Sequence, residues 1–227
     1  MDMEAEILVP EDVAVMTLPN VAFFPQALLP LHIFEPRYRL MLKEALATHR
    51  LFAVGGLDPD GEPGAFEPLH RVATLGIVRA CQENENGTSN LLLQGLARIE
   101  VVKTLQESPY RRIQIRTLAS EPGADLAVNQ QLRARIDRLL KLKQQLEEES
   151  PREITRFLRT IDDPEVFVDI AAFNLCESPL LKQKLLETLD VHERLEIFSR
   201  QLRRDIEAIK LRKRLQGSLP DDAISNN

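Results

Sequence analysis

The chain has 227 residues, 44% hydrophobic and 28% charged, a composition typical of a soluble globular protein with one large or two small domains. Its formal net charge of −6 argues against a general nucleic-acid binder, which needs a basic face to displace counterions from phosphates. The acidic start carries no export signal and no segment approaches the ~20 uninterrupted apolar residues of a membrane helix, so we expect a cytoplasmic protein without a membrane partner.

The first part of the chain is rich in Pro and Gly and contains only short apolar runs. The stretch Pro19–Leu42 is too interrupted by prolines for a membrane helix and too apolar for a surface loop, which indicates short buried strands leading into a helix. The expected elements are strands at Val13–Leu18, Leu28–Phe34 and Leu51–Val54, and a helix from Pro36 to about His49.

A hairpin is the clearest strand pair. Val72–Gln82 and Leu91–Val102 are predicted strands, and Asn86-Gly87 between them indicates a tight turn because both residues tolerate positive φ. Arg111–Leu118 alternates polar and apolar residues and predicts the last strand. The acidic Pro/Gly segment Asp58–Glu67 is expected to be a surface loop.

Helical periodicity begins after Glu121–Asp125. Ser150, Asp163 and Ser178 each precede a proline, as N-cap residues do, and Asp190 opens a capping box. These signals predict helices at Leu126–Glu149, Pro151–Thr160, Pro164–Asn174, Pro179–Thr188 and Val191–Gln216.

The two longest predicted helices carry apolar stripes with helical spacing. One stripe runs through Val191, Leu195, Phe198, Leu202, Ile206 and Ile209, and the other through Leu132, Ile136, Leu139 and Leu146. Such stripes favour a compact helical bundle. We therefore predict an α+β fold with a β-rich subdomain over residues 1–121, a helical bundle over 122–216 and a disordered tail over 217–227.

The sequence contains no recognisable catalytic or cofactor motif. The dipeptide Gly-Lys is absent, which excludes a phosphate-binding G-x-x-x-x-G-K-[ST] loop, and the sequence has no G-x-S-x-G nucleophile elbow. The four histidines lack metal-ligand spacing, and Cys81 and Cys176 are expected to be buried free thiols. We therefore expect no cofactor, no metal and no catalytic residue, and binding is the expected kind of function.

The last predicted helix is strongly basic. Its segment Arg194–Gln216 contains eight Lys and Arg residues against three Asp and Glu residues. Cations near a helix C-terminus are favourable through the helix dipole, and this is the simpler explanation. A docking or RNA-binding surface is the alternative.

Several motifs, taken in order, resemble one known family. The first part, with Thr17–Pro25, Leu29–Phe34, Gly76–Val78 and Leu92–Arg98, is similar to the N-terminal (LON) domain of the ATP-dependent protease Lon. Glu35–Arg39 resembles the version in stand-alone LON-domain proteins. The helical part resembles the same domain at Ile161–Glu165, Asp169–Ala172, Lys182–Leu189 and Asp190–Leu195.

The resemblance implies a PUA-like pseudo-barrel followed by a helical bundle. It also implies a non-catalytic role, since the chain ends where the full protease continues into its ATPase and peptidase domains. The implied partners are unfolded or degron-bearing polypeptides, bound in an apolar groove between the two subdomains. The candidate peptide-binding residues are Phe23, Phe24, Leu28, Phe34 and Tyr38.

Two other functions stay open at this point. The protein could be an adaptor that docks on intact Lon protease through its helical bundle. It could also bind RNA, because PUA-like folds often do and the last helix is basic, although the acidic remainder of the chain makes nucleic acid the less favoured partner.

Overall fold

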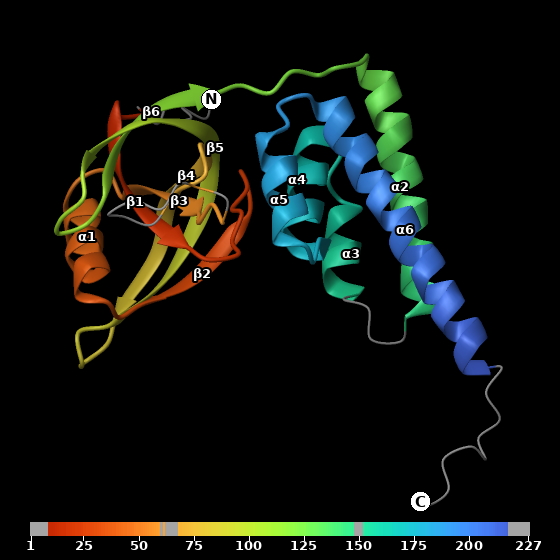
Figure 1. The fold of residues 1–227 in the computed structure, drawn as a ribbon, viewed down its shortest axis with the longest axis horizontal. Coiled ribbons are helices and arrows are strands. Elements are labelled where there is room, and N and C mark those ends of the chain that lie inside the picture. The colour runs from red at the N-terminus through yellow and green to blue at the C-terminus, as the bar shows by residue number, and fades with distance from the viewer. Residues whose placement is uncertain (1–8, 60, 62–67, 148–151, 218–227) are drawn as a thin grey trace, which may run out of the picture. The chain divides into compact units, whose positions relative to one another are not determined.

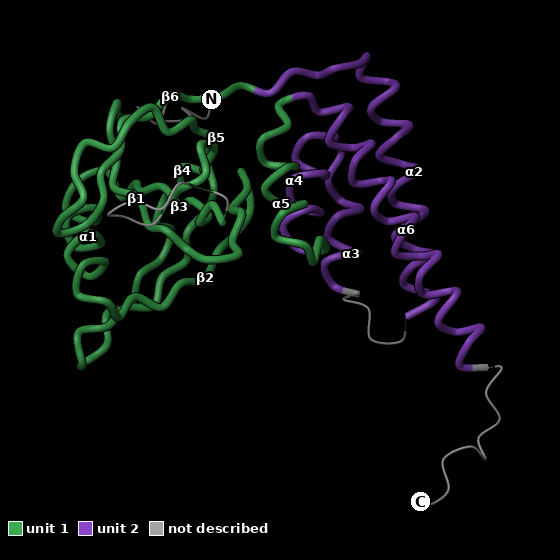
Figure 2. Tube along the Cα trace, in the orientation of Figure 1, with its two compact units in different colours: residues 1–119, 175–189 green, residues 120–174, 190–227 purple. Residues whose placement is uncertain are grey.

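The computed structural model of the chain describes residues 9–59, 61, 68–147 and 152–217. Backbone contacts divide the chain into two compact units (Figure 2). The β unit comprises residues 1–119 and 175–189, and the helical unit comprises residues 120–174 and 190–227. The expected α+β class is confirmed, whereas the segment 175–189, expected with the other helices, packs with the strands.

The elements of the β unit follow the predicted order closely (Figure 1). They are β1 (Asp12–Leu18), β2 (Leu28–Ile33), α1 (Pro36–Ala47), β3 (Leu51–Gly56), β4 (Val72–Glu83), β5 (Ser89–Gln106), β6 (Arg112–Leu118) and α5 (Pro179–Glu187). The predicted tight turn is present, with Gly87 at a φ of 74°. Most of the predicted Asp58–Glu67 loop lies outside the described residues.

The length of β5 allows the sheet to close on itself. The strand order is β2-β5-β4-β3-β1-β6, and β5 also pairs with β6. The first part of β5 pairs with β2, with Leu28 opposite Gln94, and the later part pairs with β6, with Arg98 opposite Leu118. Register shifts within β4–β5 and β5–β6 mark the bulges that bend this strand. Five strands therefore form a ring, and β2 is an added strand beside it.

Alternate residues of the five strands fill the interior of the ring. Strand side chains alternate between faces, so every second residue of a strand can point inward. The cluster contains Val13 and Val15 of β1, Leu51 and Ala53 of β3, Ala73 and Leu75 of β4, Ile99 of β5, and Ile113 and Ile115 of β6. This core makes the β unit a closed scaffold, and β3, buried along its whole length, is covered on its outer side as well.

The described residues of the helical unit form four helices close to the predicted bounds. They are α2 (Leu126–Leu146), α3 (Arg152–Leu158), α4 (Pro164–Leu175) and α6 (Val191–Gly217). Asp163 Oδ1 accepts the amide of Val166 at 2.9 Å, and Asp190 Oδ1 accepts that of Glu193 at 2.8 Å. The predicted Ser150 cap and the predicted tail over 217–227, except its first residue, lie outside the described residues. Capping therefore defines the observed starts of α4 and α6.

The long helices α2 and α6 run side by side in the same direction (Figure 1). His192 Nδ1 lies 2.8 Å from Asn129 Oδ1 near the two N-termini, and Lys143 Nζ lies 3.6 Å from Asp205 Oδ2 farther along. The α6 stripe is buried as predicted.

Two burial predictions were wrong. In the predicted α2 stripe only Ile136 is fully buried, whereas Leu132, Leu139 and Leu146 are half-buried. The buried side of this helix follows Asn129, Ile136 and Leu140 instead. Cys81 was expected to be buried and is half-buried near the end of β4, while Cys176 is buried; the two do not form a disulfide. In each case the facing neighbours, which local spacing does not reveal, determine the burial.

The ion pairs of Glu100 on β5 should make the stability of the β unit depend on pH. Its carboxylate forms ion pairs with Arg116 and Arg71. The hydrogen bond from Arg116 is the main cause of a lowered pKa for Glu100; burial opposes it, and Arg71 adds to it. A lowered folded-state pKa contributes stability that is present above the ordinary value of about 4.3 and is lost as the pH falls through the folded value.

We expect Glu100→Gln to lower the free energy of unfolding at pH 7. The difference from wild type should shrink as the pH falls from the ordinary value of about 4.3 through the lowered pKa of Glu100, because the carboxylate then gains a proton and loses the charge that pairs with both arginines. Urea unfolding at a series of pH values measures this difference. A difference that is the same at pH 7 and pH 3 would contradict the assigned role.

Candidate functional site

The five predicted peptide-binding residues divide into core and surface. Phe23, Phe24 and Tyr38 are 1%, 0% and 6% exposed, so their side chains fill the interior of the β unit. Leu28 and Phe34 are 51% and 61% exposed. Only the last two therefore offer surface to a partner in this structure.

The outer surface of β2 follows from strand alternation. Leu28, Pro30 and His32 of β2 and Phe34, the residue directly after the strand, are all exposed, while the side chains between them are wholly or partly buried. We call these four residues the β2 face. Its neighbours on β5 are Gln94, Leu92 and Asn90, opposite Leu28, Pro30 and His32.

Hydrogen bonds and ring stacking order the β2 face. His32 Nδ1 lies 2.7 Å from Asn90 Oδ1, and the His32 ring stacks on that of Phe34 with centroids 6.1 Å apart. Gln94 receives a hydrogen bond from Arg79 Nε at 2.6 Å. The face therefore holds two large apolar side chains in a frame of fixed polar groups.

The backbone edge of β2 is poorly suited to adding another strand. β2 stands at the end of the strand order, and Pro30 at its centre has no N–H to donate. Edge prolines hinder strand addition in this way. A partner on this face would therefore be held mainly by side chains.

A second feature, which the sequence did not predict, is a cavity beside α5. It has a volume of about 350 Å³. Its walls come from the loop before β2, the end of β3 and the start of α5, and they include Val21, Ala22, Leu57, Pro179 and Leu180. We call it the α5 pocket. No local pattern indicates it, because its walls are distant in sequence.

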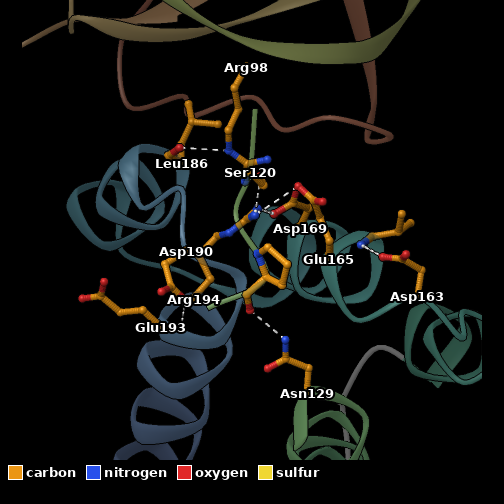
Figure 3. A network of polar contacts seen from close by, with 12 residues as sticks. Arg98, Ser120, Asn129, Asp163, Glu165, Asp169, Leu186, Asp190, Glu193 and Arg194 are labelled. Atoms are coloured by element: carbon orange, nitrogen blue, oxygen red, sulfur yellow. Dashed lines mark hydrogen bonds and ion pairs between the residues drawn. The ribbon is translucent and has the colours of Figure 1, made fainter. Parts of the chain in front are cut away.

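Two long-range hydrogen bonds attach α5 to the strands. Gln183 Nε2 donates to the carbonyl of Val72 at 3.1 Å. Arg98 Nε donates to the carbonyl of Leu186 at 3.0 Å, as Figure 3 shows. Arg98 is 2% exposed, and its guanidinium lies 5.8 Å from the ring centroid of Phe24. Arg98 thus satisfies a carbonyl in the last turn of α5.

The helical unit contains a buried charge network of its own. Arg194 is fully buried and pairs with Asp169, which is 1% exposed (Figure 3). Its Nη2 also donates to Ser120 Oγ at 2.7 Å and to Glu165 Oε1 at 3.0 Å. Arg194 is one of the eight cations in the basic segment Arg194–Gln216. Because it is buried, it does not contribute to a basic surface on the last helix, and that part of the prediction was wrong.

The burial of Arg194 has a signal that sequence reasoning missed. Arg194 lies three residues after Val191 and four before Phe198, so it belongs to the apolar stripe itself. Asp169 likewise interrupts the apolar helix α4. A cation and an anion that both occupy buried stripes need each other, since an unpaired buried charge is very costly.

The described residues show neither a metal centre nor a membrane span. Across residues 9–59, 61, 68–147 and 152–217, no three His, Cys, Asp or Glu side chains gather closely enough to hold a metal ion. None of the helices in the described ranges is long and apolar enough to cross a bilayer.

Comparison with known proteins gives consistent matches. The family model described as the ATP-dependent protease La (LON) substrate-binding domain matches residues 12–204. The Lon protease of Desulfosudis oleivorans is 27% identical over 218 residues, and that of Syntrophus aciditrophicus is 28% identical over 221 residues. Each alignment covers 94% of this chain but only 26% and 28% of the relative, so the chain spans about a quarter of their length.

Solved structures show the same fold. The N-terminal domain of Mycobacterium avium complex Lon protease matches with a TM-score of 0.66 at 18% identity, covering 84% of this chain and 97% of that domain. A Lon N-terminal domain protein from Xanthomonas campestris matches with a TM-score of 0.55 at 20% identity, covering 82% and 95%.

Loss of the hydrogen bond from Arg98 should loosen α5 but not the strands. Arg98→Met keeps most of the packed stem but leaves the Leu186 carbonyl without this donor, which costs about 1–3 kcal/mol for a buried group. Amide hydrogen exchange in α5 should accelerate by about 10-fold or more, while exchange in β4 changes little. The matched control is Arg79→Met, whose guanidinium is exposed; equal acceleration in both variants would contradict the attachment role.

The Arg194 network predicts a large, pair-specific effect. Arg194→Met leaves Asp169 buried without its main cation and should lower the free energy of unfolding by about 3–5 kcal/mol in urea titrations. The double variant Arg194→Met with Asp169→Leu should recover much of this loss, because both desolvation penalties disappear. Lys210→Met, at an exposed pair, is the control and should cost about 0.5 kcal/mol or less.

Proposed function

Because the chain belongs to the LON substrate-binding domain family, we propose that it is a non-catalytic module that binds unfolded or degron-bearing polypeptides through the β2 face. The observation that carries the proposal is the exposure of Leu28 and Phe34 on one side of β2, while the other three candidates fill the core. Unfolded chains expose apolar side chains that folded proteins bury, so such a face can distinguish the two states.

The chemistry of the β2 face supports weak, sequence-tolerant binding. Two large apolar side chains can each gain contact area with a client, while His32 and Asn90 offer polar groups for its backbone. Because Pro30 hinders the addition of a strand to β2, we expect contacts with client side chains to matter more than backbone hydrogen bonds. Many sequences could therefore be accepted, as a substrate-recognition module requires.

The proposal predicts saturable binding of the full chain to a labelled, permanently unfolded protein, measured by fluorescence anisotropy. The double variant Leu28→Ser with Phe34→Ser should weaken this binding about 10-fold, since about 0.7 kcal/mol of apolar burial by the client is lost at each of these exposed side chains. Circular dichroism should show an unchanged fold, because both side chains are exposed.

The matched control uses two other exposed apolar residues of the β unit. Val102 and Leu105 on β5 are 53% and 50% exposed, so Val102→Ser with Leu105→Ser removes similar apolar surface elsewhere. Equal weakening in the control would show nonspecific adhesion and not a site. The absence of saturable binding by the folded wild type would reject the proposal itself.

The same assay distinguishes the two other functions. Binding that occurs only with intact Lon protease would favour the adaptor role. Binding to single-stranded RNA that falls steeply between about 50 and 200 mM salt would favour the RNA role, carried by exposed cations of α6 such as Arg203, Arg212 and Arg214. Either result in the absence of unfolded-protein binding would replace the proposal.

A further inference from the structure

The α5 pocket has the dimensions of a side-chain site. Its volume of about 350 Å³ lies at the small end of the range of about 300–1,000 Å³ for ligand pockets. Apolar residues of three separate segments form most of its walls, including Val21, Leu57 and Leu180. Leu180 is 65% exposed in the first turn of α5, so a large apolar side chain remains open to solvent there.

The pocket is held in shape before any ligand arrives. Gln183, which lines it, donates to the Val72 carbonyl at 3.1 Å and to Glu187 Oε1 at 2.7 Å. At Gly56 a Cβ atom would lie 2.8 Å from the carbonyl oxygen of Val21 and 3.2 Å from His70 Cδ2. Only glycine therefore fits this part of the wall without displacing backbone, and a preformed site loses little entropy on binding.

The charges beside the pocket are acidic. His70, a lining residue, has its Nδ1 atom 3.9 Å from Asp58 Oδ1 and 4.0 Å from Glu187 Oε1. The two carboxylate side chains are 33% and 43% exposed, so part of each lies in solvent. The described residues that line the pocket include no Lys or Arg. A cation at this rim would thus meet two carboxylates.

Building on the proposed function, we infer that the α5 pocket takes one large apolar side chain of an extended polypeptide whose neighbouring residue is Lys or Arg. The apolar side chain packs against Leu180 and Leu57, and the cation reaches Asp58 or Glu187 at the rim. The net charge of −6 favours the approach of the same class of client. The inference thus names a client class: apolar segments flanked by basic residues.

Labelled 12-residue peptides in a Gly/Ser background test this inference with the full chain. They carry Leu-Lys, Leu-Glu or Ala-Lys at the centre, and anisotropy gives their dissociation constants. We expect Leu-Lys to bind about 10-fold more tightly than Ala-Lys and several-fold more tightly than Leu-Glu at 50 mM salt. The preference for Lys over Glu should fade at 500 mM salt, because partly exposed charges are screened.

Variants assign each preference to its residues. Leu180→Ser should weaken Leu-Lys binding about 10-fold. The control Leu126→Ser, at a residue 63% exposed in the helical unit, should not. Asp58→Asn with Glu187→Gln should abolish the preference for Lys over Glu while the preference for Leu over Ala stays. Each of these changes is at an exposed or partly exposed side chain, so circular dichroism should show an unchanged fold.

The outcomes separate this inference from the function on which it rests. If the unfolded protein still binds but Leu180→Ser has no effect, or if Leu-Glu binds as well as Leu-Lys at low salt, the inference is overturned and the proposed function stands. If the unfolded protein does not bind at all, both fail. A second copy of the chain as the occupant would appear as a dimer in sedimentation that Leu180→Ser dissociates, and this result would also overturn the inference.

Discussion

The hydrogen bond from Arg98 to the Leu186 carbonyl attaches α5 to the strands of the β unit, and the α5 pocket depends on this attachment. It joins β5 to a helix that lies 88 residues later in the chain, and Gln183 adds a second bond, to Val72. A helix end buried without such partners would leave polar groups unsatisfied. Because α5 is held in this way, its first turn can form the wall of a pocket whose other walls come from the strands.

The division of β2 into two faces connects the core with the proposed function. The same alternation that turns Ile33 inward leaves Leu28 and Phe34 outside, while Phe24 becomes part of the core beneath Arg98. The apolar, proline-interrupted stretch thus divides into two groups of side chains. Most of them are buried and stabilise the β unit, and a minority is exposed, where we propose that a client binds.

The charged groups follow the same division between structure and surface. Arg194 is buried between Asp169, Glu165 and Ser120, so it contributes to the helical unit and not to an exposed basic face. Asp58 and Glu187, in contrast, keep part of their carboxylates in solvent beside an apolar pocket. The sign of a residue's charge is visible in the sequence, but its exposure depends on what packs against it.

The sequence alone predicted the elements well, because each is encoded by neighbouring residues. The alternation in β6, the turn at Gly87 and the cap at Asp190 lie within a few positions of the structure they specify. The motifs of the LON domain were visible for the same reason. Only the tertiary structure decided three other features: the burial of Phe23, Phe24 and Tyr38, the attachment of α5 to the strands, and the α5 pocket. These features join residues that are far apart along the chain, and local periodicity carries no information about which distant groups will meet.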